Sequence, residues 1–339
     1  QRHFSNHPDL PGWAYGFTER TENGQRVLDH GGADPTGYGS MAVLLPDESL
    51  GFFAVTNTRF QEDLLMALPT AFLDHYYPDK AHPPSDPEPL PALEARTDAL
   101  TGTYLTNRHA RQTVAKLSLL SAPPVRVEGV GGRPGVISVL GLAGREPSRW
   151  VEIEPYLFQR EGGEARIAFE TDKDGRGTHL FARHRTPGAF DRAAWYEAPA
   201  FHQMLAGVCI LIFLTVMVGW PLAALIRHMG DRAAAFAPAV QQARGVAFGV
   251  STLNLLFLVS VGVAMSTQPL QFGVPTLVRA LFVLPLATTA MTAALPFLGG
   301  RAWTTSWSTM GRVHYALVTL VSFVFTWFLN YWNLLGFRF

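Results

Sequence analysis

Four long apolar stretches in the C-terminal part constrain this chain more than any other feature of its sequence. Each reaches the roughly 20 residues that a helix needs to cross the hydrocarbon core of a bilayer. They are residues 205–226, 245–266, 275–298 and 313–332. The alternative is a set of buried helices in a water-soluble core, but residues 203–339 contain too few polar side chains to cover such a core. We therefore expect a four-helix transmembrane bundle over residues 203–336.

The formal net charge of zero is the sum of two unlike parts. Residues 1–202 contain 20 Lys and Arg against 26 Asp and Glu, whereas residues 203–339 contain 7 Arg and a single acid, Asp231. Because the positive part is also the apolar part, a nucleic-acid binder with a basic surface is excluded. The single cysteine, Cys209, excludes an internal disulfide framework and a Cys-based metal cluster. We expect neither a cofactor nor a metal.

The arginines between the apolar stretches predict the orientation in the membrane. The first and third connections carry all of them, whereas residues 267–274 of the second connection carry no charge; the arginines are Arg227, Arg232, Arg244, Arg301 and Arg312. Cytoplasmic loops are enriched in Lys and Arg. We therefore expect a multi-pass protein of the cell membrane with residues 1–202 on the extracytoplasmic side and the lipid bilayer as a partner.

Three polar residues within the apolar stretches bear on transport. Arg279 lies near the outer face, from which its side chain can reach water, and His314 lies at the start of the fourth stretch. Only Asn254 is deep, and a single central Asn more often forms a hydrogen bond between helices than a substrate site. The pattern favours an anchoring or packing bundle over a small transporter.

The part before the membrane stretches predicts two β-rich domains. Four short strands, at 12–17, 26–31, 40–45 and 51–56, alternate with turn residues, and a helix over 61–77 packs on the resulting antiparallel sheet. A proline-rich linker follows at 79–97.

Residues 98–200 then contain seven short strands with glycine-rich turns and a helix at 111–120, which predict a small antiparallel barrel or sandwich. The acidic stretch 171–175 lacks the later ligands of a calcium loop and is interpreted as a hairpin turn. The fold class is thus multidomain α+β with an all-α membrane part, divided at 1–78, 79–97, 98–200 and 203–336.

The most informative chemistry lies in the sequence His30-Gly31-Gly32-Ala33. Two glycines on a strand leave a bare edge against which an extended substrate can lie. The amide of Ala33 can then point at a developing oxyanion, and His30 can orient or polarise a nucleophile. The alternative is that the histidine and the glycine pair form an ordinary turn or bulge.

Several motifs around this sequence resemble one enzyme superfamily. They are Gly12-Trp13-Ala14-Tyr15-Gly16-Phe17, His30-Gly31-Gly32, Gly37-Tyr38-Gly39-Ser40, Pro46-Asp47 and Val55-Thr56-Asn57. Together they resemble the C-terminal end of the class C β-lactamase-related serine hydrolases, which include penicillin-binding D,D-peptidases, D-aminopeptidases and esterases. The resemblance implies that residues 1–78 are the C-terminal part of a β-lactamase-like sheet domain.

The same resemblance assigns roles to individual residues. His30, Gly31 and Gly32 match the three positions of the third motif, K-T-G or H-x-G, so His30 is expected to face the active-site cleft and Ala33 to supply one oxyanion amide. Residues 100–200 resemble the additional β domain of membrane-anchored members, notably at Gly102-Thr103-Tyr104 and Trp195-Tyr196-Glu197.

The other catalytic motifs of that superfamily are missing from this chain. The motif S-x-x-K would hold the nucleophile. This chain has three lysines, Lys80, Lys116 and Lys173, and the residue three positions before each is not a serine: these residues are Tyr77, Thr113 and Glu170. Tyr38-Gly39-Ser40 comes after the histidine instead of before it, and Tyr331-Trp332-Asn333 lies in an apolar stretch. We expect the serine, lysine and tyrosine to lie in a preceding segment, and the chain, which begins at Gln1, to be inactive alone.

Two functions remain open at this point. The first is a serine hydrolase that forms an acyl-enzyme with an amide or ester of the cell-wall peptide, β-lactam or ester kind. An imidazole in place of the lysine's fixed charge favours esters and neutral peptides. The second is a non-catalytic membrane-anchored binding or scaffold protein of the cell envelope. Neither the substrate nor the oligomeric state is predicted.

Overall fold

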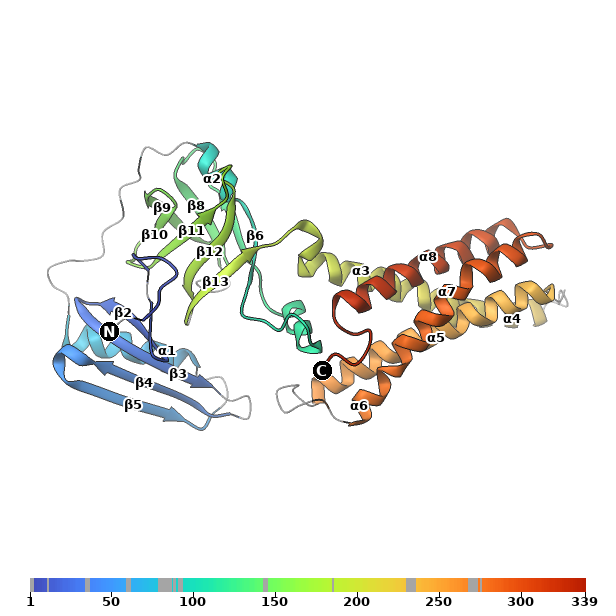
Figure 1. Ribbon diagram of the computed structural model, residues 1–339, viewed down its shortest axis with the longest axis horizontal. Coiled ribbons are helices and arrows are strands. Elements are labelled where there is room, and N and C mark those ends of the chain that lie inside the picture. The colour runs from blue at the N-terminus through green and yellow to red at the C-terminus, as the bar shows by residue number, and fades with distance from the viewer. Residues whose placement is uncertain are drawn as a thin grey trace. The chain divides into compact units, whose positions relative to one another are not determined.

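The structure is a computed structural model. In it the chain folds into two units of different class (Figure 1). It describes residues 3–10, 12–33, 37–58, 62–78, 87, 90, 94–142, 146–184, 186–229, 236–267, 274 and 276–339. The β unit comprises Gln1–Arg108 and Pro123–Ala194, and the helical unit comprises His109–Ala122 and Trp195–Phe339. The α+β class, the barrel and the four apolar helices are confirmed, whereas the four-part division of the sequence stays a prediction. Most of the predicted linker and Lys80 lie outside the described residues.

The first sheet of the β unit is antiparallel throughout, in the order β1-β2-β3-β4-β5. Its strands are β1 Gly12–Ala14, β2 Phe17–Glu22, β3 Gln25–Ala33, β4 Gly39–Leu45 and β5 Leu50–Thr56. The single strand predicted over 12–17 is wrong, because the chain reverses at Tyr15-Gly16, where both φ angles are positive. A second tight turn at Asn23-Gly24 connects β2 to β3.

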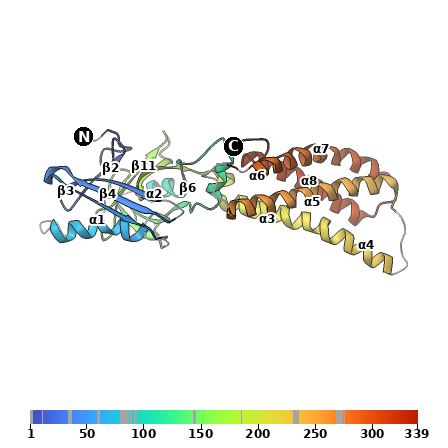
Figure 2. The ribbon, with the colours of Figure 1, turned by 90° about the horizontal axis from the view of Figure 1, so that it is seen from below.

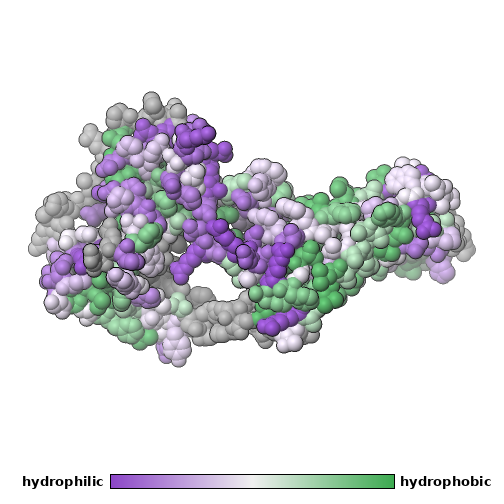
Figure 3. Space-filling view, in the orientation of Figure 1, coloured by the Kyte–Doolittle hydropathy of each residue, from purple (hydrophilic) through white to green (hydrophobic). Residues whose placement is uncertain are grey.

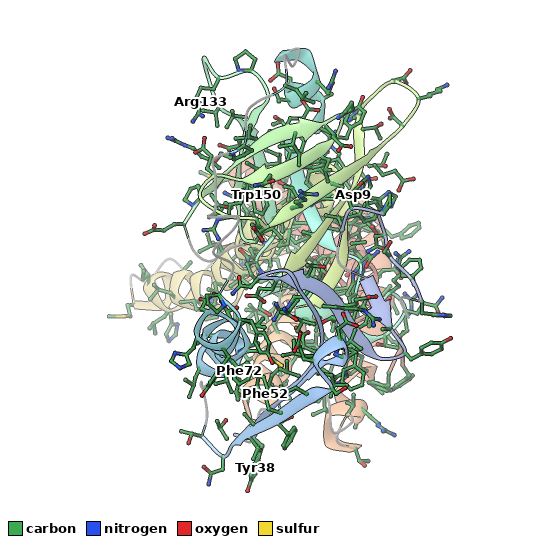
Figure 4. The ribbon with its side chains drawn as sticks, turned by 90° about the vertical axis from the view of Figure 1, so that its left-hand side faces the viewer. Asp9, Tyr38, Phe52, Phe72, Arg133 and Trp150 are labelled. Atoms are coloured by element: carbon green, nitrogen blue, oxygen red, sulfur yellow. The ribbon has the colours of Figure 1, made fainter. Side chains whose placement is uncertain are left out.

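Helix α1, Glu62–Tyr76, covers one face of this sheet, as the sequence predicts (Figure 2). Alternate residues of β4, Met41, Val43 and Leu45, are buried in a core that also contains Leu65 and Leu73 of the helix. The ring centroids of Phe52 on β5 and Phe72 on α1 lie 4.8 Å apart (Figure 4). The apolar residues that alternate along β4 and those at helical spacing along α1 therefore form one shared core.

The second sheet closes into an eight-stranded antiparallel barrel. Its strands are β6 Gly102–Thr106, β7 Val125–Gly129, β8 Val136–Leu140, β9 Ser148–Glu154, β10 Leu157–Arg160, β11 Arg166–Thr171, β12 Gly177–His184 and β13 Thr186–Arg192. The sequence predicts the first seven. It misses β13 because Pro187 and Gly188 are typical strand breakers. That strand closes the barrel, because its residues 190–192 pair with β6. The stretch 171–175 lies in the β11–β12 hairpin, in which Asp172 accepts from two backbone amides.

Side chains fill the barrel interior. The rings of Tyr104 and Phe158 each contact Phe169 edge-on, and Trp150 and Leu100 belong to the same core. Leu100 ends helix α2, Glu94–Leu100, and its carbonyl accepts a hydrogen bond from the Tyr104 hydroxyl. Burial raises the pKa of Tyr104 to about 12, since the phenolate would lose its hydration there. An eight-stranded barrel has an interior just wide enough for such filling.

One buried ion pair connects α2 to the barrel wall. The side chain of Glu152 on β9 is fully buried, and its Oε1 accepts from Arg96 Nη1 at 3.1 Å and from the amide of Tyr156 at 3.0 Å. The other oxygen has no hydrogen-bond partner among the described residues. The carboxylate thus depends on Arg96 for its charge compensation.

Replacing Arg96 by Met should therefore destabilise the barrel by about 3 kcal/mol, because it leaves a buried carboxylate without a counter-charge. Hydrogen exchange of the β9–β10 hairpin, followed by mass spectrometry, measures the effect. Arg126→Met, at an exposed position on β7, is the matched control. Equal protection of the hairpin in both variants would show that the pair is dispensable.

The helical unit contains four helices that are long and apolar enough to cross a membrane: Pro199–Ile226, Pro238–Ala264, Val278–Trp303 and Thr309–Tyr331. In detail they consist of α3 Pro199–Leu214, the π-helical turn η4 Thr215–Gly219, α4 Trp220–Met229, α5 Pro238–Thr267, α6 Thr276–Leu281, α7 Val283–Trp303 and α8 Thr309–Tyr331. Their surface is mostly hydrophobic (Figure 3). The four predicted spans are therefore confirmed as long apolar helices.

Residues 109–122, here called the insert segment, leave the barrel after β6 and return to it at β7, yet they belong to the helical unit. The helix predicted at 111–120 is a 3-10 helix, Val114–Leu120. Its residues Val114, Leu117 and Leu119 are buried in a core that also contains residues of α3 and α8. The apolar side chains that predicted a helix are thus buried against helices far away in the sequence.

Lys116 fixes the insert segment to the end of α8. Its ammonium donates to the carbonyl of Tyr331 at 2.8 Å and lies 3.8 Å from the centre of the Tyr331 ring. A cation at a helix C-terminus is favoured by the helix dipole. Burial lowers the pKa of Lys116, and Glu197 opposes that effect. Asn333 adds hydrogen bonds from its amide to the carbonyls of Arg111 and Thr113.

Replacing Lys116 by Met should loosen the insert segment, because it removes the hydrogen bond and the cation–π contact while keeping the side-chain length. We expect amide exchange of residues 112–121 to become about tenfold faster, as for a loss of roughly 1.4 kcal/mol. Gln112→Met, at an exposed position of the same segment, should leave exchange unchanged. A Lys116 variant that exchanges like the control would refute this role.

Candidate functional site

The predicted site residues lie on an overhanging end of strand β3. Pairing of β3 with β2 ends at Asp29, which is opposite Thr18, whereas pairing with β4 continues to Ala33, which is opposite Gly39. His30, Gly31, Gly32 and Ala33 are all exposed. On the side of β2, the main chain of residues 31–33 therefore has no strand partner among the described residues. This is the bare edge that the glycine pair predicts.

Asp29 determines where the overhang begins. Its carboxylate is buried and accepts hydrogen bonds from Arg20 Nε, at 2.9 Å, and from the hydroxyl of Thr18. Arg20 also pairs with Glu22, whose carboxylate accepts from Thr70 of α1. These contacts hold β2 and β3 together up to the residue before His30. No local pattern in the sequence predicts this network, because its partners are brought together only by the strand register.

His30 is held by a contact with the preceding turn. Its Nδ1 lies 2.5 Å from the carbonyl oxygen of Gly16, and since a carbonyl can only accept, Nδ1 carries the proton. In the neutral imidazole Nε2 is then an acceptor. The ring also meets Phe17 edge-on, with centroids 5.9 Å apart. His30 therefore has a fixed tautomer and can accept a proton or a hydrogen bond through Nε2.

The strand register places His30 on the sheet face opposite α1. His30 is opposite Ala42 and Ala42 is opposite Phe53, whereas Gly32 is opposite Ser40 and Ser40 is opposite Val55. A Cβ at Gly32 would lie 2.9 Å from Ser40 Oγ, so a larger residue would have to displace the serine. Because Gly32 has no side chain, no group projects from the sheet at this position next to His30.

This second face of the sheet is apolar and exposed. The side chains of Phe53 and Val55 are 67% and 62% exposed, and Leu44 adds to the same face. Tyr38, next to β4, is also largely exposed and projects away from the sheet (Figure 4). The part of this face that β4 and β5 form is therefore uncovered among the described residues, whereas α1 covers the other face. His30 and the bare edge therefore border a surface with the composition of a protein or ligand contact.

The three polar residues singled out in the apolar stretches, Asn254, Arg279 and His314, each lie in a different setting. Asn254 is buried, and its Oδ1 has no hydrogen-bond partner among the described residues, so the helix–helix bond expected through that oxygen is absent there. Arg279 is exposed and donates from Nε to the carbonyl of Val274. His314 is engaged on both ring nitrogens by Trp220 and Thr215. Arg232 and Asp231 lie outside the described residues.

The comparisons with known proteins give little further guidance. Neither the protein-family models nor the curated proteins contain a match. Two crystal structures of SurE, one of them with D-Leu, are 21% and 22% identical to this chain, with TM-scores of 0.30 and 0.28. Each match covers 54% of this chain, which spans 39% and 38% of the two solved chains. Likenesses at this level do not assign a fold or an activity.

Proposed function

We propose that this chain is the C-terminal part of a membrane-anchored serine hydrolase of the class C β-lactamase-related kind. The observation that carries the proposal is the overhang of β3, with His30 beside it and an uncovered apolar sheet face next to both. One wall of an acyl-transfer site needs such an arrangement, a bare strand edge for the substrate main chain and a polar side chain at its end. The nucleophilic serine, its lysine and the tyrosine would come from a preceding segment that packs on the uncovered face.

In this proposal the described residues position the substrate and stabilise charge. The main chain of Gly31 pairs with an extended amide or ester, and the amide of Ala33, two residues on and on the same side of the strand, donates to the oxyanion of the tetrahedral intermediate. His30 accepts or orients a proton through Nε2, because its Nδ1 is committed to Gly16. With an imidazole, which carries no fixed charge, in place of a lysine, the substrates are esters or uncharged amides in preference to carboxylate-bearing β-lactams.

We also propose that residues 1–202 lie on the extracytoplasmic side. Arginines lie where the first span ends and the second begins, and where the third ends and the fourth begins, and they support this orientation. A hydrolase of the cell envelope would then act where cell-wall peptides are. The four helices would anchor it.

A second candidate is a non-catalytic binding or scaffold protein of the envelope. The observation that favours it is that none of the three lysines of this chain follows a serine at the S-x-x-K spacing. In that case the bare edge of β3 would bind an extended peptide by strand addition without cleaving it. Covalent chemistry distinguishes the two candidates.

Covalent labelling of the full-length parent protein with a fluorophosphonate or a fluorescent penicillin tests the proposal. We expect His30→Ala to slow acylation by about 100-fold, the size of a lost proton-transfer or orienting group, with folding and membrane insertion intact. His75→Ala, on the exposed side of α1, should label like the unaltered protein. The chain of residues 1–339 alone should not label.

Two results would count against the hydrolase. Absence of labelling in a parent protein that contains S-x-x-K and Y-x-N would favour the binding protein. Unaltered acylation in the His30 variant would make that residue structural.

A further inference from the structure

His202, near the start of α3, is a fully buried histidine to which no role has been assigned above. Its ring stacks on that of Tyr331, with centroids 4.3 Å apart, and meets that of Trp332 edge-on at 5.0 Å. Tyr331 ends α8 and Trp332 follows it. Further rings of the same shell belong to Phe201, Trp327 and Phe328. An ionisable side chain is thus enclosed by aromatic rings, where a charge would lose its hydration.

A hydrogen bond within this shell specifies the protonation state of His202. The indole N–H of Trp332 donates to His202 Nδ1, and the two nitrogens lie 3.2 Å apart. Since an indole nitrogen can only donate, Nδ1 carries no proton, and the neutral imidazole has its proton on Nε2. Nε2 is buried and has no hydrogen-bond partner among the described residues. A proton added to Nδ1 would face another N–H donor, so this contact requires the uncharged ring.

Charged groups of both signs face this histidine ring. The ammonium of Lys116, from the insert segment, lies 3.8 Å from the centre of the Tyr331 ring on which the histidine stacks, so it would repel an imidazolium. Glu197, in the 3-10 helix η3 Trp195–Glu197, would attract one, and the main chain of Tyr196 faces the ring as well. A buried charge needs hydrogen bonds in addition to an opposite charge. The Nδ1–H of an imidazolium would have none while the indole remains in place.

Residues that hold the insert segment lie directly beside the two partners of this hydrogen bond. They are Gln203, which follows His202, and Tyr331 and Asn333, which flank Trp332. The amide of Gln203 donates to the carbonyl of Leu120 at 2.8 Å. The other two bind the segment at Lys116 and near its start. The bond therefore joins the start of α3 to the end of α8, the two places on which the segment is held, and the segment itself continues into β6 and β7.

Opening of this contact is linked to the binding of a proton. A histidine in water is half protonated at about pH 6.5, whereas the closed contact binds no proton at Nδ1. The open form therefore binds more protons below this pH, and its share rises by up to about tenfold for each pH unit. His202 lies only three residues after Pro199, where the first span begins. At the end of a span, the ring needs to move little to meet water.

We propose that the contact between His202 and Trp332 is an acid-sensitive latch for the insert segment. At neutral pH the uncharged imidazole accepts from the indole, and the segment stays on α3 and α8. Protonation of His202 opens the contact and releases the segment between β6 and β7. The inference does not depend on the hydrolase proposal, because all residues of the latch belong to the helical unit.

Hydrogen exchange of the full chain in detergent, expressed as protection relative to an unstructured peptide at the same pH, tests this. From about pH 7.5 to about pH 5 the protection of residues 112–121 should fall about thirtyfold, as expected for the uptake of one proton with a midpoint near pH 6.5. Strand β8 should keep its protection. An equal loss in β8 would indicate general unfolding and would overturn the latch, as would protection of residues 112–121 that does not change with pH.

Substitution of single histidines identifies the group that takes up the proton. In His202→Asn an amide oxygen can take the place of Nδ1 and cannot be protonated, so the protection of residues 112–121 should change less than about twofold over the same pH range. His228→Asn, at an exposed position of α4, is the matched control and should retain the full change. A pH dependence that persists in His202→Asn, or one that is lost in His109→Asn within the insert segment, would overturn the proposal.

A third variant keeps the latch falsifiable if His202→Asn does not fold. Trp332→Phe keeps an aromatic ring beside His202 but removes the indole donor. At about pH 7.5 the protection of residues 112–121 should therefore fall about fivefold, as for one lost hydrogen bond. Protection equal to that of the unaltered chain would show that this bond does not hold the segment and would refute the latch.

Discussion

The cost of placing polar groups in hydrocarbon governs how this chain distributes its residues. All but one of its 27 acids precede residue 203, and several hydroxyls within the apolar helices bind carbonyls of their own helix. Ser251, Ser322 and Thr326, for example, each donate to the carbonyl four residues earlier. His314 is satisfied by two neighbouring side chains. Because these groups are satisfied internally, they do not have to reach the surface of the helices, which is mostly apolar, and all the acids but Asp231 lie before the first span.

The parts of the fold that could be predicted from sequence are those that depend on local pattern. A run of apolar residues suffices for a long helix, and alternation suffices for most strands. β13 could not be predicted, because Pro187 and Gly188 disfavour a strand; they lie in the part of β13 that pairs with β12 alone, whereas β6 pairs with residues 190–192. The place of the insert segment could not be predicted either, since Lys116 meets Tyr331 from 215 residues away in the sequence.

The candidate site shows the same division. The glycine pair beside His30 predicts an exposed strand edge without any knowledge of the partners. The end of pairing at Asp29, the contact of His30 with Gly16 and the row from His30 to Phe53 depend on register, which no local pattern specifies.

The π turn of the first span also bears on how this helix tolerates changes in length. An extra residue in a regular helix rotates everything beyond it by about 100°, which would turn Trp220 and the rest of α4 away from their neighbours. A π turn absorbs such an insertion locally. A chain one residue shorter between Thr215 and Trp220 would place these two residues four apart, again on one side of an ordinary helix. The span can therefore differ in length between related sequences while both of its ends keep the same faces.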